Sequence, residues 1–125
     1  MSKSYAVWID HKEARVFHVG EGLVDKSTVL APLHHIHHKH PKGPEGARRH
    51  PDDAKRFFRA VVDTMQERDD VLIVGPSTAK LDFVRFVHEH DAPLESRIVG
   101  VETVDHPTDG QIVAFATRYF EASAA

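Results

Sequence analysis

Short runs of apolar and β-branched residues, separated by polar turns, fill the first quarter of the chain. Tyr5 to Ile9 is a continuous run of strand-forming residues, and Arg15 to Val19 carries a second set of them. The polar stretch Asp10 to Glu13 separates these runs, which is the pattern of a β-hairpin. A third run, Leu23 to Leu30, follows a Gly-Glu-Gly turn and ends before Pro32, a residue that terminates strands. The pattern predicts three antiparallel strands.

Beyond His50 the apolar spacing changes to the three-and-four period of amphipathic helices. It predicts a helix from Pro51 to near Arg68, with Asp52 and Asp53 at the positive end of the helix dipole. Two further helices are predicted at Thr78 to His90 and Thr108 to Ala122. The apolar positions expected to face the core in these helices are Ala54, Phe57, Phe58, Val61, Val62, Met65, Phe83, Phe86, Val87, Ile112, Val113, Ala116, Tyr119 and Phe120.

Two more strands are predicted between these helices. Val71 to Val74 is a continuous apolar run, as expected of a strand buried on both faces. Asp91 to Pro93 breaks the second helix, and Arg97 to Val104 follows as a strand. The order is therefore three strands, a long loop, and then helix, strand, helix, strand, helix. This order predicts an α/β fold, an RNase H-like mixed sheet with helices packed on it, in one domain spanning residues 1–125.

The segment from His34 to His50 fits neither period. It holds three prolines with Pro51 included, and two glycines, within eleven residues, which excludes a long helix or a central strand. Connections of this length in a domain are usually functional or disordered, and we expect this one to be flexible in the free protein. Because the segment is internal, it is not a purification tag. Any distinctive chemistry of the chain is expected here.

Composition narrows the class of protein. The 125 residues suit one core, and 41% of them are apolar. No run approaches the roughly 18 apolar residues that span a bilayer, and the N-terminus does not resemble a signal peptide. The chain has no cysteine, which excludes disulfides and thiolate metal sites and fits a cytoplasmic location. The formal charge of −3 argues against a generally basic nucleic-acid binder.

The charge is unevenly distributed, however. Between Leu33 and His50, four cations stand against Glu45 alone, a formal charge of +3, and six histidines add partial positive charge. Lysine and arginine neutralise RNA phosphates, and histidines can stack on bases. This interpretation predicts an RNA contact through a set of basic residues and histidines. They are Lys39, Lys42, Arg48, Arg49, His34, His35, His37, His38, His40 and His50.

Two alternatives stay open for the same segment. The His-x-His and His-x-x-His spacings of His35, His37, His38 and His40 suit zinc or nickel, which imidazole nitrogens ligate. Runs this rich in histidine bind such metals in vitro whatever their role, so weak binding is nearly uninformative. The second alternative is a solvated loop with no dedicated role.

Three aspartates suggest a nuclease as a further alternative. RNase H-like nucleases gather carboxylates at strand ends to hold two magnesium ions, and Asp10, Asp70 and Asp105 follow or precede predicted strands. Aspartate is also common at turns and helix caps. We therefore favour Asp10 in the hairpin turn, Asp70 before a strand and Asp105 as a helix cap.

Other polar residues are predicted to be structural. The turn Gly75 to Lys80 leads from a strand into a helix and could bind phosphate, but it lacks the Walker spacing of a nucleotide site. Lys80 is predicted on a solvated face, and Trp8 in the core or at an interface. The isolated histidines, His18, His88, His90 and His106, are predicted to be surface or partly buried structural residues.

Three stretches together resemble a known family. They are AVWIDHKEARVF (residues 6–17), VLIVGPSTAKLDF (Val71 to Phe83) and VDHPTDGQIVAFATRYF (Val104 to Phe120). The chain resembles the middle domain of the eukaryotic and archaeal class 1 peptide-chain release factor and of its relative Pelota. It is more closely similar to short bacterial relatives of that domain, often labelled translational machinery proteins.

The resemblance implies contact with the ribosome, through rRNA or tRNA, and a possible RNA contact for Lys80. In the release factor, the loop before the first helix of this domain carries a Gly-Gly-Gln tripeptide that helps hydrolyse peptidyl-tRNA. Here the equivalent position is the segment from His34 to His50, which has no such tripeptide, and Gln66 and Gln111 lie in predicted helices. We therefore expect a non-enzymatic, translation-related protein that requires no cofactor.

Overall fold

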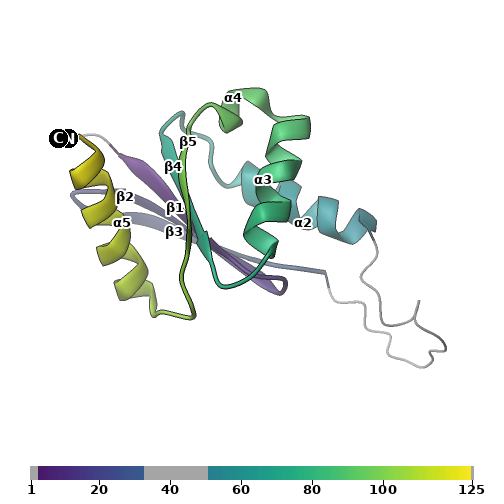
Figure 1. Ribbon diagram of the computed structural model, residues 1–125, viewed down its shortest axis with the longest axis horizontal. Coiled ribbons are helices and arrows are strands. Elements are labelled where there is room, and N and C mark those ends of the chain that lie inside the picture. Colours follow the sequence, from purple (N-terminus) through teal and green to yellow (C-terminus); the bar gives the residue numbers. More distant parts are fainter. Residues whose placement is uncertain (1–2, 33–50, 125) are drawn as a thin grey trace.

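A five-stranded sheet lies between helix α5 on one face and helices α2 and α3 on the other (Figure 1). The structure is a computed structural model that describes residues 3–32 and 51–124. Its elements in chain order are β1 (Ser4–Ile9), β2 (Glu13–Gly20), β3 (Gly22–Leu30), α2 (Pro51–Asp63), β4 (Asp70–Gly75), α3 (Ala79–His90), α4 (Ala92–Glu95), β5 (Ile98–Thr103) and α5 (Asp109–Ala124).

The strands follow the order β3-β2-β1-β4-β5. β1 pairs antiparallel with β2 and parallel with β4, β2 pairs antiparallel with β3, and β4 pairs parallel with β5. β1 and β4 are central and covered on both faces, which is why their sequences are continuously apolar. The predicted mixed α/β sheet with helices packed on it is confirmed.

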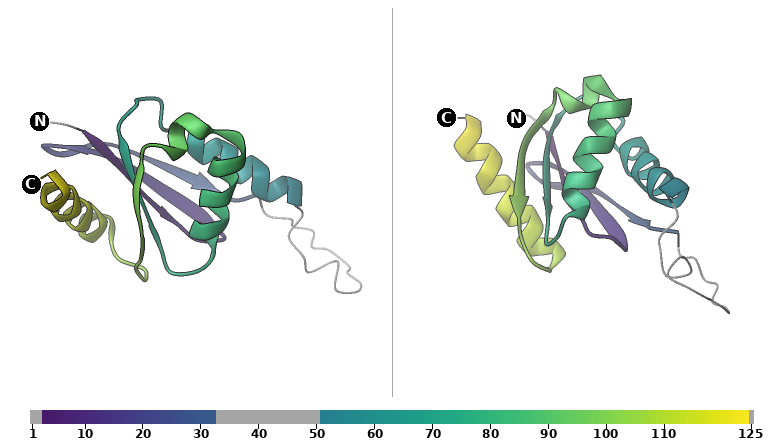
Figure 2. Two further views of the ribbon diagram at one scale, coloured as in Figure 1. Left: turned by 45° about the horizontal axis from the view of Figure 1, so that its top comes forward. Right: turned by 45° about the vertical axis from the view of Figure 1, so that its right-hand side comes forward.

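Each face of the sheet has its own hydrophobic core. Figure 2 shows from two sides that helices cover both faces. On the face of α2 and α3, the fully buried residues include Val7, Ile9 and Phe83. On the face of α5, they include Trp8 and Phe17. Neighbouring residues of β1 belong to different cores because side chains alternate along a strand. Trp8, predicted in the core or at an interface, is a core residue with no exposed surface.

Two helix boundaries differ from the predicted ones. α2 ends at Asp63 rather than near Arg68, because the amides of Thr64 and Met65 bond to the carbonyls three residues earlier, at 3.1 and 3.0 Å. Met65 is still buried, which is why the apolar period continued past the end of the helix. The chain also forms the short helix α4, whose first turn is capped by the Asp91 carboxylate, 3.1 Å from the Leu94 amide.

Two glycines allow close approach between elements. A Cβ atom at Gly75 would clash with the backbone carbonyl oxygen of Ile9, so the end of β4 lies against β1 only because this residue is glycine. A Cβ atom at Gly100 would clash with the hydroxyl of Tyr119, which lies over β5 from α5. Packing of α5 near the edge strand therefore depends on the missing side chain.

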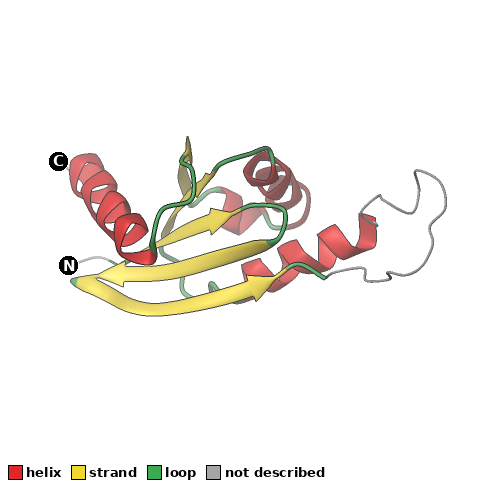
Figure 3. Cartoon of the chain, turned by 90° about the horizontal axis from the view of Figure 1, so that it is seen from below, coloured by secondary structure: helices red, strands yellow, loops and turns green. Residues whose placement is uncertain are grey.

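The two described residues that flank the histidine-rich segment lie at one end of the molecule. The chain leaves the described region after Pro32 and resumes at Pro51, at the end of the molecule opposite to the start of β1 and the end of α5 (Figure 3). The hairpin turn between β1 and β2 lies beside this point, because the Ala31 amide donates to the Lys12 carbonyl at 2.8 Å. Among the described helices, none is long and apolar enough to cross a bilayer.

Candidate nucleic-acid interface

The predicted basic and metal-ligating residues of the histidine-rich segment lie outside the described residues. They are His34, His35, His37, His38, Lys39, His40, Lys42, Arg48, Arg49 and His50. Their proposed contacts therefore stay predictions. The structure does define the surface that surrounds the two ends of this segment, and that surface is formed by α2, α3 and the hairpin turn.

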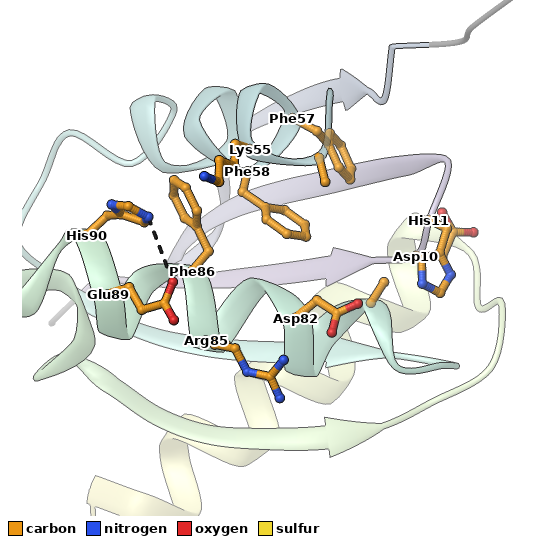
Figure 4. Close-up of a pocket in the computed structure, with 12 residues that line it drawn as sticks. Asp10, His11, Lys55, Phe57, Phe58, Asp82, Arg85, Phe86, Glu89 and His90 are labelled. Atoms are coloured by element: carbon orange, nitrogen blue, oxygen red, sulfur yellow. Dashed lines mark ion pairs between the residues drawn. The ribbon is translucent and has the colours of Figure 1, made fainter. Parts of the chain in front are cut away.

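A groove of about 290 Å³ lies between α2 and α3 and extends to the hairpin turn (Figure 4). Its apolar floor consists of Phe57 and Phe58 of α2 and Phe86 of α3, together with two alanines. The three phenylalanines pack against one another, with ring centroids 5.6 to 5.7 Å apart for the pairs that Phe58 makes with the other two. These rings belong to the hydrophobic core on this face of the sheet, so packing within the core holds the floor of the groove in place.

Charged side chains form the rim of the groove. Lys55 stands on the α2 side, while Asp82, Arg85 and Glu89 follow one another along α3. All four are exposed. No motif in the sequence singles these residues out. Their spacing beside the apolar face of each helix was visible in the sequence, but which two helices lie side by side is decided by tertiary packing.

Two flat side chains flank Phe86 at one end of the groove. The Arg59 guanidinium lies over the Phe86 ring, 5.1 Å from its centroid, and the His90 ring lies 4.6 Å from it at 41°. His90 also approaches Glu89, with Nε2 3.9 Å from Oε1. This end of the groove thus offers a cationic plane and an imidazole next to an aromatic ring.

The prediction that Lys80 lies on a solvated face is wrong. Lys80 is only 7% exposed, and its ammonium donates to the Ser77 carbonyl at 2.7 Å. The aliphatic part of the side chain is buried while the ammonium closes the turn that precedes α3. An RNA contact by Lys80 stays a prediction, although its ammonium already has this backbone partner.

The three aspartates of the nuclease alternative are not brought together. Asp10 follows the carboxyl end of β1, whereas Asp70 pairs with Ser4 at the opposite end of that strand. Asp10 occupies the hairpin turn as predicted, since its carboxylate accepts from the amides of Lys12 and Glu13 at 2.8 and 2.9 Å. Within the described ranges, no group of three or more histidine, aspartate or glutamate side chains could hold a metal ion.

Asp105 does not cap α5, which corrects the prediction. Its side chain is 94% exposed and contacts the neighbouring His106 at 2.9 Å. The cap is a reciprocal pair, in which Thr108 Oγ1 accepts from the Gln111 amide at 3.2 Å and Gln111 Oε1 accepts from the Thr108 amide at 2.9 Å. His106 Nε2 also lies 3.7 Å from Asp10, which links the α5 entry to the hairpin turn.

A polar network fastens α5 to the sheet. The Asp109 carboxylate accepts hydrogen bonds from the Arg15 guanidinium of β2 at 2.7 Å and from the Lys26 ammonium of β3 at 2.6 Å. These two hydrogen bonds hold the pKa of the Asp109 carboxyl below its usual value, and the bond from Lys26 has the larger effect. The Arg15 guanidinium also lies over the Trp8 ring at 4.5 Å, and the Trp8 indole donates to the Asp105 carbonyl at 2.8 Å.

A second polar cluster lies at the other end of the sheet. His18 stacks on Tyr5 with centroids 4.2 Å apart, and its Nε2 is 2.7 Å from Asp69. The Tyr5 hydroxyl accepts from the Glu67 amide at 3.1 Å. Burial is the main reason why the pKa of Tyr5 is raised. As predicted, His18 is a partly buried structural residue, and it anchors the connection between α2 and β4.

The fold and the arrangement of elements are those of the middle-domain class found in Pelota and archaeal release factors, as predicted. Pelota of Thermoplasma acidophilum superposes with a TM-score of 0.62 at 21% identity, over 93% of this chain and 32% of that one. Pelota of Archaeoglobus fulgidus superposes with a TM-score of 0.60 at 14% identity, over 93% of this chain and 31% of that one. The archaeal translation termination factor aRF1 superposes with a TM-score of 0.52 at 12% identity, over 98% of this chain and 40% of that one.

The chain thus spans about a third of the Pelota chains and two fifths of the termination factor. No profile of a known protein family matches its sequence, and no curated protein matches it. At these identities the likeness shows the fold. What the neighbours do as whole proteins bears on this chain only as support for a proposal.

Proposed function

We propose that the protein is a non-enzymatic, translation-related protein that associates with the ribosome and contacts rRNA or tRNA through its histidine-rich segment. The observation that carries the proposal is the likeness to Pelota and to a translation termination factor across 93 to 98% of the chain. The segment between β3 and α2 would replace the Gly-Gly-Gln loop that the resemblance places there, and it carries cations in place of the tripeptide.

Charge supports an RNA contact at this end of the molecule. The segment carries a formal +3 in a chain whose total is −3, so the remainder is acidic. The helix that begins directly after the segment, α2, adds no net charge, because its three cations are balanced by three aspartates. The positive charge is therefore concentrated in the segment itself. Phosphate contacts dominate the affinity of proteins for nucleic acids, so concentrated cations at one end favour RNA over an uncharged partner.

The test is co-sedimentation with ribosomes from lysate on a sucrose gradient. Wild type is compared with a variant in which Lys39, Lys42, Arg48 and Arg49 are replaced by alanine. We expect wild type to travel with ribosomal particles and the variant to stay at the top. We also expect binding to strengthen from about pH 8 to pH 6, since protonated histidines add positive charge, and to weaken with salt.

A second variant controls for the loss of four charges. It replaces four exposed cations outside the segment, and its net charge equals that of the segment variant; they are Lys3, Lys26, Arg68 and Arg118. Lys26→Ala removes an exposed ion pair, which contributes little to stability. If both variants lose the ribosome equally, the segment has no special role. If wild type never leaves the top of the gradient, the proposal is wrong.

The metal alternative is decided on the same preparation. Tag-free protein purified without added metal is analysed for zinc and nickel, because His35, His37, His38 and His40 could ligate either ion. Stoichiometric, tightly bound metal, combined with no ribosome association, would favour a metal-binding module. Absence of metal in protein that travels with ribosomes supports the RNA contact.

A further inference from the structure

We propose that β3 is a dimerisation edge, along which β3 of a second copy of this chain pairs antiparallel and joins the two sheets into one. β3 lies at the outer edge of the sheet, and among the described strands it pairs with β2 alone (Figure 3). It has nine residues, more than the average strand. The inference goes beyond the proposed function, and it holds or fails without regard to ribosome association.

The hydrogen bonds of the hairpin show which backbone groups of β3 face the free edge. The Ala31 amide donates to the Lys12 carbonyl at 2.8 Å, so these two residues form a hydrogen-bonded pair. Such pairs alternate with non-bonded pairs along an antiparallel ladder, so the next bonded positions on β3 are Val29 and Ser27. The residues between and beside them direct their N–H and C=O groups away from β2; they are Lys26, Thr28 and Leu30.

The usual protection of a sheet edge is weak on this part of β3. Native edges carry proline, solvated charges or bulges, which prevent pairing with another chain. β3 contains no proline, and its register shift lies before Asp25. The Asp25 carboxylate accepts from the Lys26 amide at 2.9 Å, and the Lys26 ammonium donates to Asp109 at 2.6 Å. Both charged side chains of the strand are therefore bonded within the fold.

The opposite edge of the sheet is better protected. β5 has six residues, and its pairing with β4 shifts register between Val71 and Leu72. The Tyr119 hydroxyl donates to the Val99 carbonyl at 3.4 Å, so a side chain of α5 already bonds to the backbone of this strand. Of the two edges, β3 is the one that is prepared for another strand.

One register of a symmetric pair suits the outward-facing groups of β3. A twofold axis through Thr28 places the two Thr28 residues opposite each other, and Leu30 opposite the partner's Lys26. The Thr28 residues then exchange two backbone hydrogen bonds, and each Leu30 amide donates to the partner's Lys26 carbonyl. Threonine pairs across strands are favourable, whereas an axis through Lys26 would place two lysines opposite each other.

The same register covers an exposed apolar side chain. Leu30 is 71% exposed, the largest exposure among the large hydrophobic residues of the described ranges. In the dimer it lies beside the aliphatic part of the partner's Lys26, whose ammonium is held by Asp109. Pairing of this kind is isologous, since the same patch is used in both copies, and it closes at two subunits.

Cysteine cross-linking tests the register, because the chain has no cysteine of its own. Residues of a hydrogen-bonded antiparallel pair have Cα atoms about 5.5 Å apart, which is within disulfide range. Thr28→Cys, at an exposed position, should give a cross-linked dimer on a non-reducing gel after mild oxidation. Leu30→Cys is the matched control on the same strand. Its counterpart would lie about 13 Å along the strand, too far for a disulfide.

Analytical ultracentrifugation from about 1 μM to about 1 mM tests the dimer itself. The mass of wild type should rise from 14.1 kDa towards twice that value. Thr28→Pro removes one outward-facing N–H from each copy and none that bonds to β2, so Kd should rise about thirtyfold. Thr28→Lys, which keeps the N–H and opposes two charges, should raise Kd about fivefold. Thr103→Lys, exposed on β5, is the matched control and should dimerise as wild type does.

Each result decides the proposal. Wild type that stays at 14.1 kDa throughout overturns it, whatever cross-links the cysteine variants form. A dimer that Thr28→Pro and Thr28→Lys leave unchanged, while circular dichroism shows both variants folded, uses another surface and also overturns it. If wild type is monomeric and Thr28→Lys alone loses ribosomes in co-sedimentation, β3 pairs with a strand of another protein, and the second copy is the wrong occupant.

Discussion

The two faces of the sheet use charge in different ways. On the α5 face, charged groups bond to one another and to the backbone: Asp109 joins Arg15 and Lys26, and Arg15 also lies over Trp8. On the opposite face, Lys55 and Arg85 are exposed and make no ion pair with any residue of the described ranges. The contrast separates charge that positions a helix from charge that is available to a ligand.

The contrast also shows why a count of charges says little about function. On the α5 face, Arg15 and Lys26 are cations too, but both are already bonded to Asp109 within the fold. Ion pairs at a surface contribute modestly to stability. Cations without an ion-pair partner can neutralise nucleic-acid phosphates and so release the counterions condensed there. Substitutions on the two faces test this contrast, and the largest loss of stability is expected on the α5 face.

Trp8→Ala should weaken the α5 face most. Trp8 has no exposed surface, supports the Arg15 guanidinium and donates to the Asp105 carbonyl at 2.8 Å. Truncating a buried tryptophan costs about 3–5 kcal/mol of unfolding free energy, measured by urea denaturation with circular dichroism. Trp8→Phe, which keeps most of the volume but loses the N–H donor, should cost less. Equal losses in the two variants would show that the cavity is unimportant.

Gly100→Ala should be the second largest effect. The new methyl group would clash with the Tyr119 hydroxyl, so the Tyr119 ring, or α5 with it, must move away from β5. Overpacking of this kind costs about 1–3 kcal/mol. The same substitution in a Tyr119→Ala background should cost little, because the clashing ring is gone. A double-mutant cycle measures the difference, and additive losses would show that the contact does not limit how α5 packs.

Local patterns predicted the elements and the fold class, but not their partners. The apolar run of β1 showed that the strand is buried, and the spacing from Ala54 to Met65 identified α2. The end of α2 was missed because Met65 stays buried in the turn that follows. The capping pair of Thr108 and Gln111 is readable in the sequence as a threonine three residues before a glutamine, at the predicted start of this helix.

The candidate site was harder to predict for a physical reason. The groove exists because α2 and α3, separated by a strand, lie side by side on one face, and no local pattern fixes that arrangement. The solvated position predicted for Lys80 failed for a similar reason, because its ammonium finds the Ser77 carbonyl once the turn is folded. The histidine-rich segment was found from composition alone, and its contacts stay predictions.

Asp109→Asn should have a smaller, pH-dependent effect. The folded pKa of Asp109 is lowered by bonds from Lys26 and Arg15, so its contribution is present above its ordinary value of 3.8 and lost as pH falls through the folded pKa. The side chain is 42% exposed, and we expect a loss of about 1 kcal/mol or less at neutral pH. Urea denaturation at about pH 7 and pH 3 should show the difference from wild type shrinking in acid.

Glu89→Gln on the groove rim is the matched control for Asp109→Asn. Each substitution replaces a partly or fully exposed carboxylate by its amide, but the one ion-pair contact of Glu89 among the described residues is His90, at 3.9 Å. It should leave the unfolding free energy within about 0.5 kcal/mol of wild type. A loss as large as that of Asp109→Asn would mean that the rim carboxylates also hold helices in place, and the contrast between the faces would weaken.

Lys55→Ala combined with Arg85→Ala should have the smallest effect on stability. Both residues are exposed helix positions on the groove rim, and alanine is a good helix former, so the unfolding free energy should stay within about 0.5 kcal/mol of wild type. Arg15→Ala, which removes a cation from the α5 face, should by contrast cost more, since Asp109 and Trp8 both lose a contact. Urea denaturation of the two variants in one buffer makes the comparison direct. If the rim variant were the less stable one, its cations would be structural, and the groove would have to be explained without a ligand.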